Sequence, residues 1–136
     1  MSVLTECHVG AGHKALVVDD EPVVGQIMCR VLEQMGYAVE HATDGDQALA
    51  LARQQSYDIV ICDLLMPHTN GMALYDAWQE EAPQLTRRMV FVTGDSLGNE
   101  TSDFIKRTGC RCVFKPFRLN DLAEIIMQVQ QEVGVA

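Results

Sequence analysis

Residues 59–67 read IVICDLLMP, a continuous apolar run followed by an acidic residue and a loop. The run from Ile59 to Cys62 is rich in β-branched residues and does not alternate with polar ones, as in a strand covered on both faces of a parallel sheet. Similar apolar runs occur at residues 15–18, 89–92 and 112–114. Residues 37–41 alternate more, which favours an edge strand. The sequence therefore predicts five strands in a parallel sheet.

Between these runs, apolar residues recur at spacings of three and four, the period of an α-helix. The first predicted helix has Pro22 in its first turn and stops at Gly36. Asp44 is available to cap the second helix, and Pro83 closes off the third. The later helices are predicted over residues 46–54, 72–78, 97–108 and 122–133.

Strand and helix therefore alternate five times along the chain. Parallel strands joined through helices need right-handed crossovers, which predicts an open three-layer α/β sandwich. A flavodoxin-like (βα)5 fold with strand order 2-1-3-4-5 fits, and it places ligand chemistry at the carboxyl ends of strands one and three. We expect one domain over residues 14–136 and a poorly ordered N-terminal extension over residues 1–13.

The formal net charge of -9 comes from 19 acidic and 10 basic residues. A surface of this sign repels nucleic acid and anionic lipid, so neither direct nucleic-acid binding nor membrane contact is expected. No long apolar run or secretory signal occurs, which predicts a cytoplasmic protein. The five cysteines are an odd number without zinc-ligand spacing, and the four histidines form no motif. We expect structural thiols and exposed, incidental histidines.

Acidic residues stand directly after the first and third predicted strands. The first strand runs into VVDDEP, which places Asp19 and Asp20 at its carboxyl end, and the third delivers Asp63 to the same edge. Like charges this close disfavour each other unless a cation or protons intervene. Carboxylates, a backbone carbonyl and water are the oxygen ligands that Mg²⁺ prefers. The sequence therefore predicts a Mg²⁺ site at this edge.

A carboxylate beside Mg²⁺ can attack phosphorus and form an acyl phosphate. Phosphoryl transfer depends mainly on positioning and on charge neutralisation. Two further residues at strand ends supply donors, Thr93 in VFVTGD and Lys115 in VFKPF. We therefore expect Asp63 to accept a phosphoryl group whose oxygens contact the Thr93 hydroxyl and the Lys115 ammonium.

Over nearly its whole length, the chain resembles the receiver domains of response regulators in two-component signalling. The family's acidic pair matches Asp19 and Asp20, and its phosphorylated aspartate matches Asp63. Its hydroxyl residue and its lysine match Thr93 and Lys115. Each motif alone is weak, but five in register on the expected elements form a specific pattern. VFVTGD and FKPF resemble receivers attached to hybrid sensor kinases more than those attached to DNA-binding domains.

This resemblance implies a role for each site residue. Asp20, Asp63 and the backbone carbonyl of Leu65 would bind Mg²⁺, with Asp19 acting mainly through water. Asp63 would take the phosphoryl group from a histidine kinase or a histidine phosphotransfer protein. A downstream protein target would then bind the altered surface. Because the domain assists only its own phosphorylation and dephosphorylation, we do not expect an independent enzyme.

One position departs from the family pattern. Many receivers carry, three positions before the lysine, an aromatic residue that swings inward on phosphorylation, but this chain has Cys112. A small side chain cannot convert a threonine shift into a large aromatic rotation, so signalling is expected to follow another route. The resemblance also implies a cis peptide bond between Lys115 and Pro116.

Three other functions fit parts of the pattern. A flavodoxin-like cofactor binder needs a phosphate-cradling loop after strand one, where DDEP stands instead. A metal-dependent phosphatase needs an acid-base carboxylate two residues after its nucleophile, whereas Asp63 is followed by LLMP. A pseudo-receiver would bind partners without phosphorylation, and the intact acidic site disfavours it.

Overall fold

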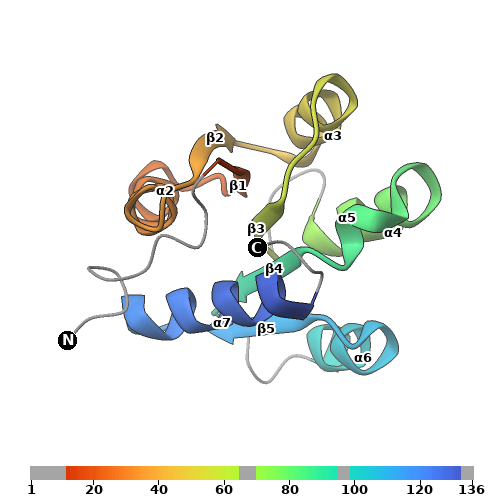
Figure 1. The fold of residues 1–136 in the computed structure, drawn as a ribbon. Helices are drawn as coiled ribbons and strands as arrows, with labels where there is room; N and C mark the ends of the chain where they lie inside the picture. Colours follow the sequence, from red (N-terminus) through yellow and green to blue (C-terminus); the bar gives the residue numbers. More distant parts are fainter. Residues whose placement is uncertain (1–11, 65–69, 95–98, 133–136) are drawn as a thin grey trace.

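Strands and helices alternate within residues 12–64, 70–94 and 99–132, the parts of the chain that the computed structural model describes (Figure 1). The strands are β1 (Lys14–Val18), β2 (Ala38–Ala42), β3 (Ile59–Asp63), β4 (Met89–Thr93) and β5 (Arg111–Phe114). The helices are α2 (Pro22–Gln34), α3 (Gly45–Gln54), α4 (Gly71–Glu81), α5 (Pro83–Thr86), α6 (Asn99–Thr108) and α7 (Leu119–Glu132). The five predicted strands are thus confirmed.

The five strands form one parallel sheet in the order β2-β1-β3-β4-β5. The interior strands β3 and β4 are buried along their whole length, whereas the edge strands β2 and β5 are partly exposed. This burial follows from the sequence, because continuous apolar runs need cover on both faces and the alternating run does not. The predicted flavodoxin-like order 2-1-3-4-5 is confirmed.

Helices cover both faces of the sheet and give three layers (Figure 1). Side chains alternate between the two faces along each strand. Val17 and Ile61 face the layer that contains α2 and α7, while Leu16 and Phe91 face the layer that contains α3, α4 and α6. Each face therefore has its own apolar core, and the two cores hold the strands in place between them.

Local signals set several helix ends. Asp44 caps α3, because its carboxylate accepts a hydrogen bond of 2.8 Å from the backbone N–H of Gln47. Asn70 caps α4 by accepting from the N–H of Ala73 at 2.9 Å. Gly109 follows α6 with a φ of +68°, a left-handed conformation that glycine adopts without strain. The proposed cap at Asp44 is confirmed.

Two expectations about the helices need correction. Pro83 closes off α4 but also begins the short helix α5, because the fixed φ of proline suits the first turn of a helix. Val23 and Ile27 share the apolar period of the first helix, yet their side chains are 68% and 42% exposed. Periodicity does not distinguish an apolar residue that faces the sheet from one at the margin of the stripe.

Some predicted features fall outside the described residues. These are most of the expected extension over residues 1–13, the start of the helix over 97–108 and the end of the last helix at residue 133. Among the described residues, no helix has both the length and the apolar composition needed to cross a membrane.

The Trp78 side chain, only 1% exposed, is a large member of the core beneath α4. We predict that Trp78→Ala lowers the free energy of unfolding by about 3–5 kcal/mol, because the substitution leaves a cavity that close-packed neighbours cannot fill. Val23→Ala, at an exposed position on α2, should change it by less than about 0.5 kcal/mol. Chemical denaturation measures both values, and equal effects would contradict the assigned core.

Candidate functional site at the carboxyl edge of the sheet

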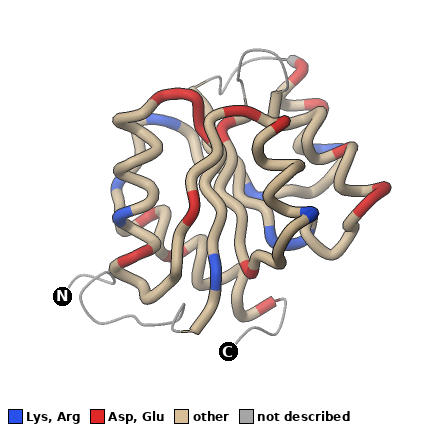
Figure 2. The backbone as a smooth tube through the Cα atoms, turned by 90° about the horizontal axis from the view of Figure 1, so that it is seen from above, with Lys and Arg blue, Asp and Glu red and all other residues tan. Residues whose placement is uncertain are grey.

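Acidic residues gather at the edge of the sheet where the strands end. β1 runs directly into Asp19 and Asp20, and β3 ends at Asp63. One carboxylate oxygen from each of the three side chains lies within 4.8 Å of the others. Figure 2 shows several acidic segments at the upper edge of the tube. The prediction that two distant strands bring three carboxylates to one place is confirmed.

Asp19 is the most constrained of the three carboxylates. Its side chain is fully buried, and its Oδ1 accepts a hydrogen bond of 2.8 Å from the backbone N–H of Glu21. Its Oδ2 is buried without a hydrogen-bond partner. Burial raises the pKa of the Asp19 carboxyl, although the Glu21 N–H and the Lys115 ammonium oppose the shift. An ionised Asp19 therefore needs a cation or a water molecule at Oδ2.

Asp63 is 5% exposed and lies at the last position of β3. The parallel ladder pairs it with Val92, which brings the ends of β3 and β4 together. Lys115 Nζ lies 4.0 Å from Asp63 Oδ2. The lysine is partly exposed, with 28% of its side chain accessible, so its ammonium can reach a group attached to Asp63.

Thr93 and Lys115 are held next to each other by the sheet. Thr93 is buried at the end of β4 and pairs with Phe114 in the ladder. The backbone N–H of Lys115 then donates a hydrogen bond of 2.8 Å to the carbonyl of Thr93. The peptide bond between Lys115 and Pro116 is cis, as the resemblance implied. Both predicted donors therefore stand at the edge that holds the carboxylates.

The described ligand set fits a hard divalent cation. The three carboxylates offer oxygen atoms alone, and the buried Oδ2 of Asp19 has no protein hydrogen bond. Oxygen ligands without sulfur or nitrogen favour Mg²⁺ over softer metals. The expected fourth protein ligand, the carbonyl of Leu65, lies outside the described residues.

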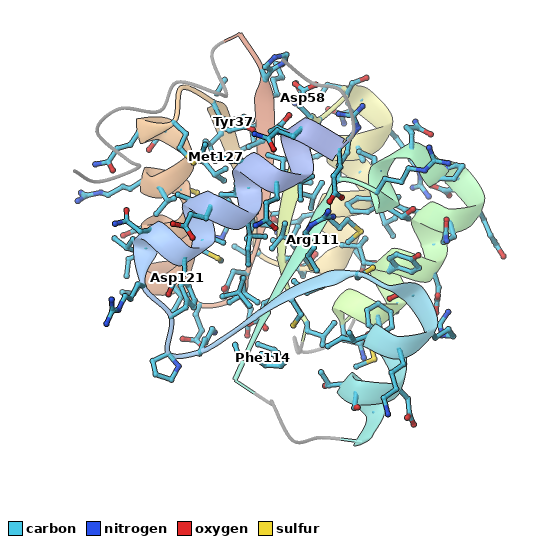
Figure 3. The ribbon with its side chains drawn as sticks, turned by 60° about the horizontal axis from the view of Figure 1, so that its bottom comes forward. Tyr37, Asp58, Arg111, Phe114, Asp121 and Met127 are labelled. Atoms are coloured by element: carbon cyan, nitrogen blue, oxygen red, sulfur yellow. The ribbon has the colours of Figure 1, made fainter. Side chains whose placement is uncertain are left out.

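Cys112 lies at the position where receivers often carry an aromatic residue. It is partly exposed, and with Phe114 and the α6 residue Ile105 it lines a groove of about 420 Å³. Burial raises the pKa of the Cys112 thiol to about 11, so the thiol is protonated at neutral pH. The aromatic residue of β5 is Phe114, which is labelled in Figure 3. Phe114 is 39% exposed. At the other end of β5, Arg111 forms an ion pair with Glu132 of α7.

The expectation that the histidines are exposed and incidental is wrong for two of them. His13 is partly buried, and its Nδ1 lies 3.3 Å from a carboxylate oxygen of Asp58. His41 is partly buried on β2, and its Nε2 lies 2.9 Å from the backbone carbonyl oxygen of Asp19. Both contacts join segments far apart in the sequence, so local spacing gave no sign of them. His8 and His68 lie outside the described residues.

Comparison with known proteins identifies the family. Residues 15–127 match the family model for the response regulator receiver domain. The chain is 32% identical to the sensor protein EvgS of Escherichia coli (strain K12) over 121 residues, which are 89% of this chain and 10% of that protein. The chain therefore spans about a tenth of the length of this relative.

Solved structures share the fold along most of the chain. The signal receiver domain of a signal transduction histidine kinase from Syntrophus aciditrophicus matches with a TM-score of 0.79 and 25% identity, over 92% of this chain and 95% of that one. TrrA from Thermotoga maritima, in complex with Mg(2+)-BeF, matches with a TM-score of 0.76 and 26% identity, over 86% and 98%. The resemblance to receivers of sensor kinases is confirmed, and the chain belongs to the family of response regulator receiver domains of two-component signalling.

Proposed function

We propose that Asp63 accepts a phosphoryl group from a phosphohistidine of a histidine kinase or a histidine phosphotransfer protein. The observation that carries this proposal is the buried Oδ2 of Asp19, which has no hydrogen-bond partner and belongs to the cluster formed with Asp20 and Asp63. A cation that contacts this oxygen through a bound water molecule would also neutralise the site enough for a phosphoryl group to approach.

Asp20 and Asp63 would hold Mg²⁺ with the carbonyl of Leu65, and Asp19 would act mainly through a bound water molecule. The bound cation supplies charge neutralisation for the incoming phosphoryl oxygens. Asp19 contributes because its backbone and its Oδ1 are already fixed, which leaves Oδ2 oriented by the fold rather than by the ligand.

The residues of the chain have separate roles in the transfer. A carboxylate oxygen of Asp63 forms a bond to phosphorus while the bond between phosphorus and the donor imidazole nitrogen breaks, and that nitrogen keeps the electron pair. The Thr93 hydroxyl and the Lys115 ammonium then donate to the phosphoryl oxygens. Attack by water on phosphorus returns Asp63 to the carboxylate and releases phosphate. Receiver domains are signalling modules rather than classical enzymes, and this one would assist only its own modification.

An apolar surface beside the site would dock the phosphodonor protein. A groove of about 320 Å³ lies between α2 and the segment after β5, and Lys115 forms one of its walls. Ile27 and Leu119 line it, and their side chains are 42% and 43% exposed. Lys115 also faces Asp63, so a protein seated in this groove would bring its phosphohistidine to the acidic cluster.

The remaining assignments complete the proposal. We propose that the domain occupies residues 14–136 after an N-terminal extension over residues 1–13, and that the exchange takes place in the cytoplasm. Phosphorylation adds a charge of about −1.5 to −2, which would recruit Thr93 and Lys115 and alter the surface offered to a downstream protein. With Cys112 in place of an aromatic residue, this change would spread through the segment after β4 rather than through a rotating ring at position 112.

The phosphoacceptor role makes a direct prediction for Asp63. Incubation with acetyl phosphate and Mg²⁺ should add one phosphoryl group to the wild type, as measured by intact-mass spectrometry. The adduct should be absent without Mg²⁺ and absent in Asp63→Ala, because both the charge neutralisation and the nucleophile are required. If Asp63→Ala carries the same adduct, Asp63 is not the acceptor. If the wild type neither binds Mg²⁺ nor takes an adduct, the domain is a pseudo-receiver.

The buried carboxylate makes a second prediction. In EDTA at pH 7, Asp19→Asn should raise the unfolding midpoint by a few degrees, because the variant removes a buried negative charge. The raised pKa of Asp19 means that the ionised form costs stability above that pKa, so the gain should shrink as the pH falls and protonation neutralises the wild-type group. Asp103→Asn, at an exposed position on α6, is the control. A lower midpoint for Asp19→Asn would contradict the electrostatic account.

The docking groove makes a third prediction. Ile27→Glu should slow phosphorylation by a phosphohistidine protein that is active on the wild type by about tenfold or more, because it places a charge in an apolar contact. Phosphorylation by acetyl phosphate should be unchanged, since a small donor does not need the groove. Gln34→Glu, at an exposed position at the far end of α2, controls for added charge. Equal slowing with both donors would remove the groove from the docking surface.

A further inference from the structure

His41 contacts the backbone of the acidic segment from the neighbouring strand. It lies on β2 opposite Val17 of β1, in a position where its ring reaches past the end of β1. Its Nε2 lies 2.9 Å from the carbonyl oxygen of Asp19. Because a carbonyl oxygen only accepts, this contact is a hydrogen bond when Nε2 carries the proton. The ring nitrogen is therefore directed at the backbone of Asp19.

Strand β2 also holds the backbone N–H of Asp19. The backbone N–H of Asp19 donates a hydrogen bond of 3.0 Å to the carbonyl of Ala42. The carboxylate Oδ1 accepts from the N–H of Glu21 at 2.8 Å. Together with the His41 contact, these bonds fix the N–H, the carbonyl and one carboxylate oxygen of Asp19. The remaining oxygen is Oδ2, which is buried without a hydrogen-bond partner.

Gly25 provides the space that the His41 ring occupies. It lies inside α2, where glycine is less favourable than alanine. A Cβ atom built on Gly25 would lie 2.5 Å from His41 Nε2 and nearer still to Cε1. No side chain is compatible with the ring at that separation, so the ring and a residue larger than glycine exclude each other. Packing against the His41 ring therefore explains a glycine that helix propensity alone would disfavour.

We propose that His41 is a positioning residue for the metal site: its ring, seated against Gly25, fixes the Asp19 backbone and so directs Oδ2 toward the cation and its bound water. This inference rests on the proposed function, since it assigns His41 a part in the same Mg²⁺ site. His41 is assigned no ligand role, because its Nε2 is directed at the Asp19 carbonyl oxygen and the ligand cluster consists of Asp19, Asp20 and Asp63. Groups that hold a ligand from outside the coordination sphere commonly change metal affinity by about 10–100-fold when they are removed.

The first test separates the hydrogen bond from the bulk of the ring. His41→Met supplies a side chain of similar length without a hydrogen-bond donor, whereas His41→Gln places an amide N–H at the reach of Nε2. We expect His41→Met to weaken Mg²⁺ binding by about tenfold and His41→Gln to stay within about threefold of the wild type, as measured by isothermal titration calorimetry. The unfolding midpoint of each variant in EDTA reports stability separately from the metal.

The second test uses the contact between Gly25 and His41. In the wild-type background, Gly25→Ala should displace the ring and weaken Mg²⁺ binding to about the level of His41→Met. In a His41→Ala background, Gly25→Ala should cause no further loss of Mg²⁺ affinity and should raise the unfolding midpoint, because alanine favours the helix. We therefore expect Gly25→Ala to lower the midpoint in the wild-type background, where it clashes with the ring, and to raise it in the His41→Ala background.

The outcomes distinguish this inference from the proposed function. A wild type that binds Mg²⁺, with a His41→Met variant that is less stable but binds Mg²⁺ equally well, would overturn the positioning role alone. The same conclusion follows if Gly25→Ala lowers Mg²⁺ affinity equally in both backgrounds. A wild type that does not bind Mg²⁺ would overturn the proposed function and this inference together.

Discussion

Three carboxylates share one edge of the sheet, and their mutual repulsion is the constraint on which the rest of the site depends. Oxygen atoms of Asp19, Asp20 and Asp63 lie within 4.8 Å of one another, and the Asp19 side chain is fully buried. Such an arrangement is unfavourable unless a cation joins it. The fold sustains this arrangement because two apolar cores, one on each face, hold β1 and β3 side by side. The packing of the two apolar cores thus holds the three carboxylates closer together than their mutual repulsion favours.

The positions of the donors follow from the same parallel sheet. β4 lies beside β3, and β5 lies beside β4, so Thr93 and Lys115 come to the same edge of the sheet as the carboxylates. Lys115 also borders the apolar groove next to α2, which places the chemistry and the proposed contact for a phosphodonor on one side of the molecule. Because Lys115 contacts both Asp63 and the groove, a change in charge at Asp63 would act on the groove through Lys115.

Much of this arrangement could be predicted from the sequence, because each site residue directly follows a strand marked by a continuous apolar run. Once the strands are parallel, their carboxyl ends must meet. The missed features depend on a local turn or on how distant segments pack together. The short helix α5 begins at Pro83 after a turn, and apolar periodicity does not predict such a turn. The exposure of Ile27 depends on which part of the apolar face of α2 packs against the sheet. The contact of His41 with Asp19 joins β2 to the end of β1, and the glycine that accommodates the ring lies on a third segment, α2.

The central claim is that the acidic edge binds Mg²⁺ and presents Asp63 to a phosphoryl group. The most direct measurement is a crystal structure of the wild type grown with Mg²⁺ and beryllium fluoride, which mimics a phosphoryl group on a carboxylate. The account predicts beryllium fluoride on a carboxylate oxygen of Asp63, a cation bound by Asp20 and Asp63, and contacts from Thr93 and Lys115 to the fluorine atoms. Density for the cation or for beryllium fluoride at another place, or at no place, would contradict it.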